Sequence, residues 1–144
     1  MTPAELARFA LGLPEATEEQ PFGPGADVYK VAGKIFALFS PERIPPSVAL
    51  KCDPPMAVAL RREYEAVIPG YHLNKKHWNT VIFDGSIPDA EIEDMVIHSY
   101  ERVIAGLPRL VRQRLERAQS DHERLRVALL RSGRVELGPL VWEP

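Results

Sequence analysis

The chain has 144 residues, of which 45% are hydrophobic, and its formal net charge is −2 at neutral pH. This size suits one compact domain with its own core, and this charge excludes a whole-protein attraction to nucleic acid or acidic membranes, so any basic surface must be local. The single cysteine, Cys52, excludes an internal disulfide and fits a reducing cytoplasm, while no signal-peptide pattern and no run of roughly 20 apolar residues is present.

The first predicted element is a helix near the N-terminus. Thr2 is placed to cap it, Pro3 suits its first position, and Glu5 completes a capping box. The residues predicted to form its inner face are Leu6, Phe9, Ala10 and Leu13. Pro14 ends the helix, and an acidic loop rich in glycine and proline is expected to follow as far as about Gly25.

Three strands are predicted next. Residues 28–31 and 35–40 form a hairpin through Ala32-Gly33, where glycine supplies a positive φ angle, and residues 47–51 form the third strand. The segment 35–39 is apolar at every position, which predicts a central strand covered on both faces.

A second helix is predicted to begin after Asp53, its capping residue. Its inner stripe is expected to comprise Met56, Leu60 and Tyr64, with Arg61 and Arg62 turned outward.

A short extended piece at 67–68 and a strand over about 77–83 follow, and then a third helix begins at Pro88 and ends near Gly106. The inner face of this third helix is expected to comprise Ile92, Met95, Val96, Ser99, Val103 and Leu107.

The segment from Arg109 to Arg134 contains eight arginines, three acids and no lysine, for a formal charge of +5. Two short helices are predicted here, the second capped by Ser120. Its arginines either provide a phosphate-binding face or form a solvated face paired with acids such as Glu116 and Glu123. The arginines concerned are Arg112, Arg114, Arg117, Arg124, Arg126 and Arg131. Residues 135–142 are predicted to form an extended arm that packs on the sheet or on a second subunit, which would give a homodimer.

The segment 70–80 concentrates polar, cationic and aromatic side chains between two turn signals. Its candidate binding residues are Tyr71, His72, Asn74, Lys75, Lys76, His77, Trp78 and Asn79. The lysines suit phosphates, the asparagines suit phosphates or base edges, and the aromatic rings suit stacking on unpaired bases. Lys30, Lys34 and Lys51 extend a basic strip if their strands adjoin the strand that begins near His77.

Each of these residues also has a structural interpretation. Trp78 on a strand commonly packs in a core, and Tyr71 after Pro-Gly commonly covers a sheet edge. Asparagines in turns satisfy backbone groups, and adjacent lysines are commonly a solvated surface. Strand alternation places His77 and Asn79 on one face and Trp78 and Thr80 on the other.

Metal binding and catalysis find little support in the sequence. The five-residue gap between His72 and His77 fits neither a helical histidine pair nor a paired-cysteine zinc site, and His98 is expected to point away from its helix's apolar stripe. No nucleophile elbow, P-loop or dinucleotide fingerprint occurs. A general base at His72 or His77 lacks an evident carboxylate partner. We therefore expect no metal and no cofactor, and we lean against an enzyme.

A set of short motifs keeps its order across about residues 5–108. They are Leu13-Pro14, Pro21-Phe22-Gly23, Val28-Tyr29-Lys30-Val31, Gly33-Lys34, Leu50-Lys51-Cys52-Asp53-Pro54, Leu60-Arg61, Pro69 to Val81, Asp84-Gly85 and Ser99-Tyr100. In these motifs the chain resembles the MmcQ/YjbR family. The resemblance implies an α+β fold of the CyaY-like, or frataxin-like, type, in which helices cover an antiparallel sheet, and it implies DNA binding.

The expected organisation is a family domain over residues 1–108 and an arginine-rich helical and extended extension over 109–144, packed on the same domain. The expected function is binding of DNA or another polyanion through the 71–79 segment and nearby lysines. The alternatives are a non-catalytic interaction module for a protein or small ligand and, less favoured, an enzyme that uses His72 or His77.

Overall fold

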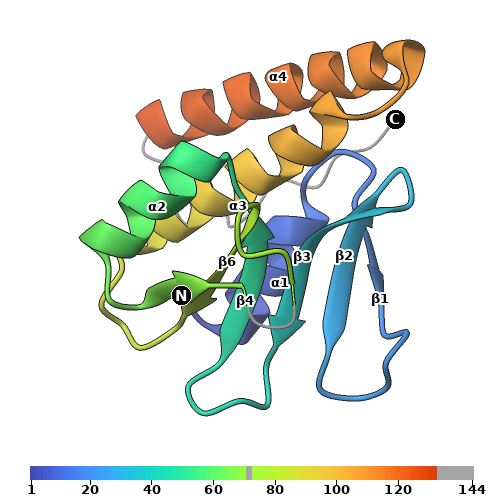
Figure 1. Ribbon diagram of the computed structural model, residues 1–144. Coiled ribbons are helices and arrows are strands. Elements are labelled where there is room, and N and C mark those ends of the chain that lie inside the picture. Colours follow the sequence, from blue (N-terminus) through green and yellow to red (C-terminus); the bar gives the residue numbers. More distant parts are fainter. Residues whose placement is uncertain (71–72, 133–144) are drawn as a thin grey trace.

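The computed structural model describes residues 1–70 and 73–132 (Figure 1). The elements, in chain order, are α1 (Pro3–Leu11), β1 (Thr17–Glu19), β2 (Asp27–Val31), β3 (Lys34–Ser40), β4 (Ser47–Lys51), α2 (Pro54–Glu63), β5 (Val67–Pro69), β6 (Trp78–Ile82), α3 (Asp89–Ala105) and α4 (Arg109–Arg131). The protein is therefore α+β, as the sequence predicted. Within the described ranges, no helix is both long and apolar enough to cross a membrane.

The six strands form one antiparallel sheet in the order β1-β2-β3-β4-β6-β5. The predicted strands are present, and β4 has the predicted bounds. The first strand, β1, was not expected, because all three of its residues are exposed and polar and carry no apolar alternation. It pairs with β2 at the edge of the sheet, with Thr17 opposite Lys30 and Glu19 opposite Val28.

A bulge in β3 explains its unbroken apolar run. Tyr29 pairs with Ala37 whereas Lys30 pairs with Ile35, so that Phe36 is the extra residue. Phe36 and Ala37 are both fully buried although they are adjacent. Ile35 and Leu38 are only half-buried. The prediction that both faces of this strand are covered is therefore wrong at these two positions, because the bulge redirects the apolar residues towards one face.

Helices α1 and α3 share one buried cluster with a single face of the sheet. Figure 1 shows α1 lying behind the strands and α4 running alongside α3. The Tyr100 hydroxyl donates to the Pro14 carbonyl oxygen at 2.7 Å, and the Tyr100 and Phe36 rings form a T-shaped pair with a centroid separation of 5.5 Å. These contacts join α3 to the turn that follows α1 and to β3.

Helix α2 differs from the prediction in two ways. Its most buried residue is Ala57, whereas Met56 is 43% exposed and Leu60 and Tyr64 are only partly buried. Asp53 stands at the N-cap, but its side chain makes no capping hydrogen bond and lies 3.8 Å from Arg102 instead. Arg61 turns inward, contrary to expectation, and Arg62 is exposed.

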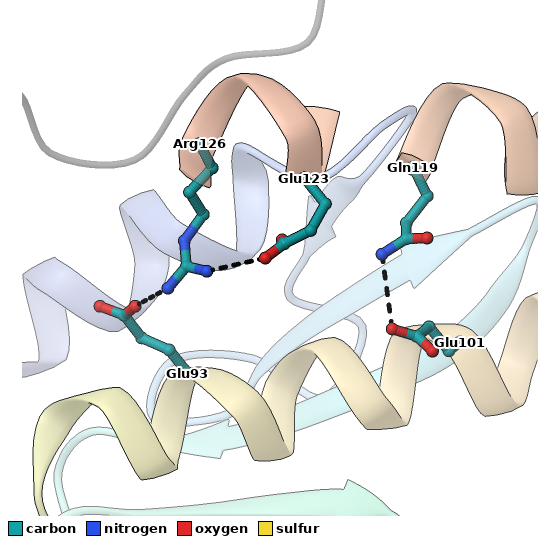
Figure 2. Close-up of polar contacts among 5 residues, drawn as sticks. All are labelled: Glu93, Glu101, Gln119, Glu123 and Arg126. Atoms are coloured by element: carbon teal, nitrogen blue, oxygen red, sulfur yellow. Dashed lines mark hydrogen bonds and ion pairs between the residues drawn. The ribbon is translucent and has the colours of Figure 1, made fainter. Parts of the chain in front are cut away.

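The arginine-rich segment forms one continuous helix, α4, where two short helices were predicted. Ser120 lies inside this helix, so its capping pattern is not used. Leu115 anchors α4 in the core, and Gln119 donates to Glu101 of α3 at 3.4 Å (Figure 2). The predicted terminal arm, residues 135–142, lies outside the described residues.

Arg126 joins α4 to α3 through two carboxylates. Its guanidinium donates to Glu93 of α3 and, at 3.1 Å, to Glu123 of α4, as Figure 2 shows. The same group lies 5.5 Å from the centre of the Phe9 ring. Other arginines of α4 pair with acids as well: Arg112 with Glu116, Arg114 with Glu15, and Arg124 with Asp121. The contacts therefore favour the acid-paired interpretation of this helix for these four arginines.

Candidate functional site

Three predicted residues meet at one end of the sheet. Lys34 begins β3, Lys51 ends β4, and Trp78 begins β6 directly opposite Lys51. Because residues opposite each other in a pair of strands project to the same face, Lys51 and Trp78 are neighbours. All three line an open groove of about 470 Å³, which the C-terminal part of α3 completes with Arg102. We call the groove lined by Lys34, Lys51, Trp78 and Arg102 the basic groove.

The cations of the basic groove are largely free of carboxylates. Neither Lys34 nor Lys51 forms an ion pair with any residue in the described ranges. Arg102 lies 3.8 Å from Asp53, and its Nε atom is buried without a hydrogen-bond partner in the described part of the chain. The groove thus carries three cationic side chains against one nearby acid, and its partly exposed indole provides an aromatic wall.

The loop before β6 is held in a fixed turn. Asn74 accepts the Lys76 backbone N–H on its side-chain oxygen at 2.9 Å, and its carbonyl oxygen accepts from His77 and Trp78. Asn74 therefore satisfies backbone groups, as the structural interpretation proposed. Lys75 and Lys76 are exposed and pair with no acid among residues 1–70 and 73–132.

Arg61 of α2 clamps this loop to the body of the protein. Its Nε donates to Asn79 Oδ1 at 2.7 Å, and its Nη2 donates to the carbonyl oxygens of Lys75 and, at 3.3 Å, Trp78. Asn79 Nδ2 also donates to the Ala57 carbonyl oxygen at 3.3 Å. Asn79 is only 2% exposed, so the expectation that it hydrogen-bonds phosphates or base edges is wrong: its amide bonds within the protein.

The strand pairing at Gly70 leaves no room for a side chain. Its backbone N–H donates to the Trp78 carbonyl oxygen at 2.9 Å, and a Cβ atom at Gly70 would lie 2.8 Å from the Trp78 Cβ. Glycine is therefore required where β5 and the loop approach Trp78.

Lys30 does not join the basic groove. Its Nζ lies 2.7 Å from Glu19 Oε2 on the neighbouring strand β1. Because β1 was not predicted, this carboxylate was not anticipated, and the expectation that Lys30 extends the basic strip is wrong. Tyr71 and His72, the other two predicted contact residues, lie outside the described residues.

The histidine and cysteine candidates do not assemble a catalytic or metal centre in the described part of the chain. His77 is half-buried, and within residues 1–70 and 73–132 its Nδ1 has no hydrogen-bond partner and its ring forms no ion pair with a carboxylate. No group of three or more histidine, cysteine, aspartate or glutamate side chains in residues 1–70 and 73–132 is placed to hold a metal ion.

His98 and Cys52 lie in protected surroundings. His98 is half-buried, and its Nε2 accepts the Asp53 backbone N–H at 3.2 Å, so its proton resides on Nδ1. Burial and the neighbouring Arg102 lower the pKa of His98. Burial and Asp53 raise the pKa of the Cys52 thiol. Both groups are consequently neutral near pH 7, and Cys52 lacks the thiolate character of a reactive cysteine.

Two residues of the site were not identified as such from the sequence, Arg61 and Arg102. Arg61 is chemically identical to the exposed Arg62 beside it, and only the three-dimensional position of Asn79 distinguishes them. Arg102 is four residues beyond His98 and therefore lies on the same side of α3. That spacing was the one available signal that Arg102 faces the end of β4.

The fold and this site define a small α+β protein with a cation-lined groove at one end of its sheet. The chain belongs to the YjbR family, whose sequence profile matches residues 11–102. That match ends before α4 begins at Arg109, so α4 lies outside the matched segment.

Relatives and solved structures agree with this membership. The chain is 40% identical over 108 residues to the uncharacterized protein YbdF of Escherichia coli O157:H7, covering 75% of this chain and 88% of YbdF. It is 37% identical to the uncharacterized protein YjbR of E. coli K12, covering 75% and 92%.

Among solved structures, the Deinococcus radiodurans protein DR2400, described as a DUF419 domain, aligns with a TM-score of 0.74 and 33% identity, covering 80% of this chain and 88% of that one. A Pseudomonas syringae protein aligns with a TM-score of 0.61 and 24% identity, covering 69% and 96%, and shows the fold alone.

Proposed function

We propose that this protein binds a polyanion, with DNA as the favoured ligand, along the basic groove and the adjacent Lys75-Lys76 loop. The observation that carries the proposal is the convergence of Lys34, Lys51 and Arg102 on one open groove beside Trp78. Three strands and α3 supply these residues, so the cations are held on rigid elements and not on a long flexible loop.

The overall charge makes this local arrangement significant. Because the chain carries a formal charge of −2, it has no general attraction for polyanions. A phosphate backbone is attracted where cations are concentrated and unpaired, and each neutralised phosphate releases counterions. Lys34 and Lys51 meet this requirement, whereas the arginines of α4 that pair with acids do not.

The indole adds a means of contacting bases. Trp78 is partly exposed and lines the groove, so we expect its ring to stack on an unpaired base that enters there. Stacking of a base on an aromatic side chain contributes about 1–3 kcal/mol. We therefore expect a single strand to bind more tightly than a duplex of the same sequence.

Three further expectations belong to this proposal. A cytoplasmic location follows from the unpaired Cys52, the CyaY-like label follows from the family resemblance, and a homodimer through the C-terminal extension follows from the predicted arm. These remain predictions.

Fluorescence anisotropy with a labelled single strand and its duplex across a salt series tests the proposal. Affinity is expected to fall as salt rises, with a log–log slope of about 0.9 per phosphate contacted for duplex and about 0.7 for single strands. Lys34→Ala/Lys51→Ala is expected to weaken binding and to reduce the slope by about one for each lysine that contacts a phosphate. Lys75→Ala/Lys76→Ala is expected to act in the same direction.

A matched control separates position from net charge. Arg124→Ala/Arg131→Ala removes the same two charges from exposed positions in the last two turns of α4. This control is expected to bind nearly as wild type does. Absence of binding even at low salt, or equal losses in the groove variant and the control, contradicts the proposal.

A further inference from the structure

A second hollow is lined by Leu50 and Asn79, which strand alternation places on the opposite face of the sheet from Trp78. It has a volume of about 200 Å³ and lies between α2, α3 and the strands β4 and β6. Leu50 and Val81 form its floor, and Leu60 and Met95 form its walls. Apolar hollows of this kind with a few well-placed polar groups are the usual form of a small-molecule site.

The Arg61–Asn79 contact explains why the hollow is not filled. Asn79 donates to the Ala57 carbonyl oxygen and accepts from Arg61. These hydrogen bonds, and not a large apolar side chain, therefore lie between α2 and the sheet. The residue that α2 buries is the small Ala57, while Met56 stays at the mouth of the hollow. Two methionines, Met56 and Met95, give the lining an adaptable shape.

The hollow contains polar groups with unused hydrogen-bonding capacity. Asn79 is 2% exposed, lines the hollow, and uses one of its two Nδ2 hydrogens and one bond to Oδ1. His98 also lines it, and since its Nε2 accepts from Asp53, its Nδ1–H is a donor that no described residue accepts. The lining therefore combines apolar contact with free polar positions.

The mouth of the hollow is acidic. Glu91 and Asp94 are exposed, lie three residues apart on the same face of α3, and form no ion pair within residues 1–70 and 73–132. Lys51 also lines the hollow, but it forms no ion pair with either carboxylate in the described ranges, and strand alternation places its side chain on the face of Trp78, opposite that of Leu50. Two unpaired carboxylates beside an apolar interior favour a cation with an apolar body.

We infer that this hollow binds a small amphipathic amine, with its apolar body between α2 and α3 and its ammonium group between Glu91 and Asp94. An apolar cavity of about 150 Å³ holds benzene, so a hollow of about 200 Å³ accepts a ring with a short arm. Neutral His98 at its wall does not repel the cation. This inference does not rest on polyanion binding, so either proposal can fail without the other.

Cys52 provides a direct test, since it is the chain's single cysteine and lines the hollow. Because the Cys52 thiol is buried and its pKa is raised, we would follow its modification by methyl methanethiosulfonate to completion at about pH 8.5, with 2-phenylethylamine, 2-phenylethanol or phenylacetate present. Phenylethylamine is expected to slow the modification in a saturable manner and to raise the melting temperature. The neutral alcohol is expected to protect about tenfold less well, corresponding to about 1.4 kcal/mol, and the anion least.

Two variants complete the test. Glu91→Gln/Asp94→Asn is expected to bring protection by the amine down to that by the alcohol, while Glu63→Gln/Glu65→Gln, exposed at and just beyond the end of α2, is expected to leave it unchanged. Equal protection of Cys52 by the amine and by the alcohol, in the protein that carries none of these substitutions, overturns the assignment of a cationic ligand. No saturable protection by any of the three molecules overturns the site itself.

Discussion

Arg61 Nε lies 2.7 Å from Asn79 Oδ1, and this one contact connects the two surfaces described above. On one side, the Arg61 guanidinium holds the carbonyl oxygens of Lys75 and Trp78 and so positions the loop beside the basic groove. On the other side, the same contact separates α2 from the sheet and leaves the apolar hollow. An arginine on a surface helix is therefore an internal support for both candidate sites.

Removing this support is expected to destabilise the fold. Arg61→Ala removes the Arg61 donor from Asn79 Oδ1 and from the Lys75 carbonyl oxygen, and leaves the Trp78 carbonyl oxygen with the Gly70 N–H as its remaining donor. We expect the free energy of unfolding to fall by about 2–3 kcal/mol, the cost of losing hydrogen bonds from a charged group. Urea denaturation measures this change. Arg62→Ala at the exposed next position is the matched control, with an expected change within about 0.5 kcal/mol. Equal, small effects in both variants would show that the clamp contributes nothing.

Ser99 is expected to be a second structural support. Its hydroxyl is fully buried, accepts the Lys51 backbone N–H at 2.8 Å and donates to the Phe36 carbonyl oxygen at 2.6 Å. Ser99→Ala is expected to lower the free energy of unfolding by about 1–3 kcal/mol, because both backbone groups lose a buried partner. Ser132→Ala, which removes an exposed hydroxyl at the end of α4, is the control. A Ser99→Ala protein as stable as the control contradicts this role.

The stability of the protein is expected to depend on pH through His98. Burial lowers the pKa of His98 in the folded state, so the unfolded chain takes up the proton first as pH falls. The contribution of neutral His98 to the free energy of unfolding is fully present above about pH 6.5, the ordinary pKa of histidine. It is lost as pH falls through the lowered pKa of His98 in the folded state. Protonation also removes the Nε2 acceptor of the Asp53 N–H.

Urea denaturation of the unmodified protein and of His98→Gln at several values between about pH 7.5 and pH 5 measures this effect. The unmodified protein is expected to lose stability more steeply than His98→Gln, whose amide oxygen can still accept from Asp53. Since the other histidines are common to both proteins, the difference between the two curves reports His98. Parallel curves would be the contrary result.

Arg126 is expected to be the principal link between α4 and α3. Its side chain is 18% exposed, bonds to Glu93 and Glu123, and lies over the Phe9 ring. Arg126→Ala is expected to cost about 2 kcal/mol of unfolding free energy, with little dependence on salt. Arg124→Ala breaks an exposed pair with Asp121 and is expected to cost less than about 0.5 kcal/mol. Chemical denaturation at low and high salt distinguishes them, and comparable losses in both would refute the link.

The contrast between Arg124 and Arg126 also shows where sequence reasoning is limited. Periodicity and turn residues predicted the sheet's main strands and the helices α1 to α3, because apolar spacing reflects burial directly. Nothing local distinguishes Arg126 from Arg124, or Arg61 from Arg62, because their partners lie on other elements. The capping pattern at Ser120 was misleading, since a long helix tolerates a serine in its interior when Leu115 and Arg126 hold it to the core.

The candidate site was predictable only in part for the same reason. Lys34, Lys51 and Trp78 meet because β3, β4 and β6 are consecutive strands of the sheet. The sequence did not predict this strand order, so the basic strip was expected only if these strands adjoined. Lys30 does not belong to the groove because it pairs with Glu19. Glu19 lies on β1, a polar strand that apolar alternation could not predict. Asn79 was misassigned because strand alternation gives two faces but does not say which one is buried.

The central claim, that a nucleic acid occupies the basic groove, is tested most directly by the fluorescence of Trp78. The Trp142→Phe variant leaves Trp78 as the chain's single tryptophan. On titration with a single-stranded oligonucleotide, we expect Trp78 emission to be quenched at the concentrations that saturate anisotropy, to recover with added salt, and to stay unquenched at those concentrations in the Lys34→Ala/Lys51→Ala background. Unchanged Trp78 emission at saturating oligonucleotide would contradict the claim.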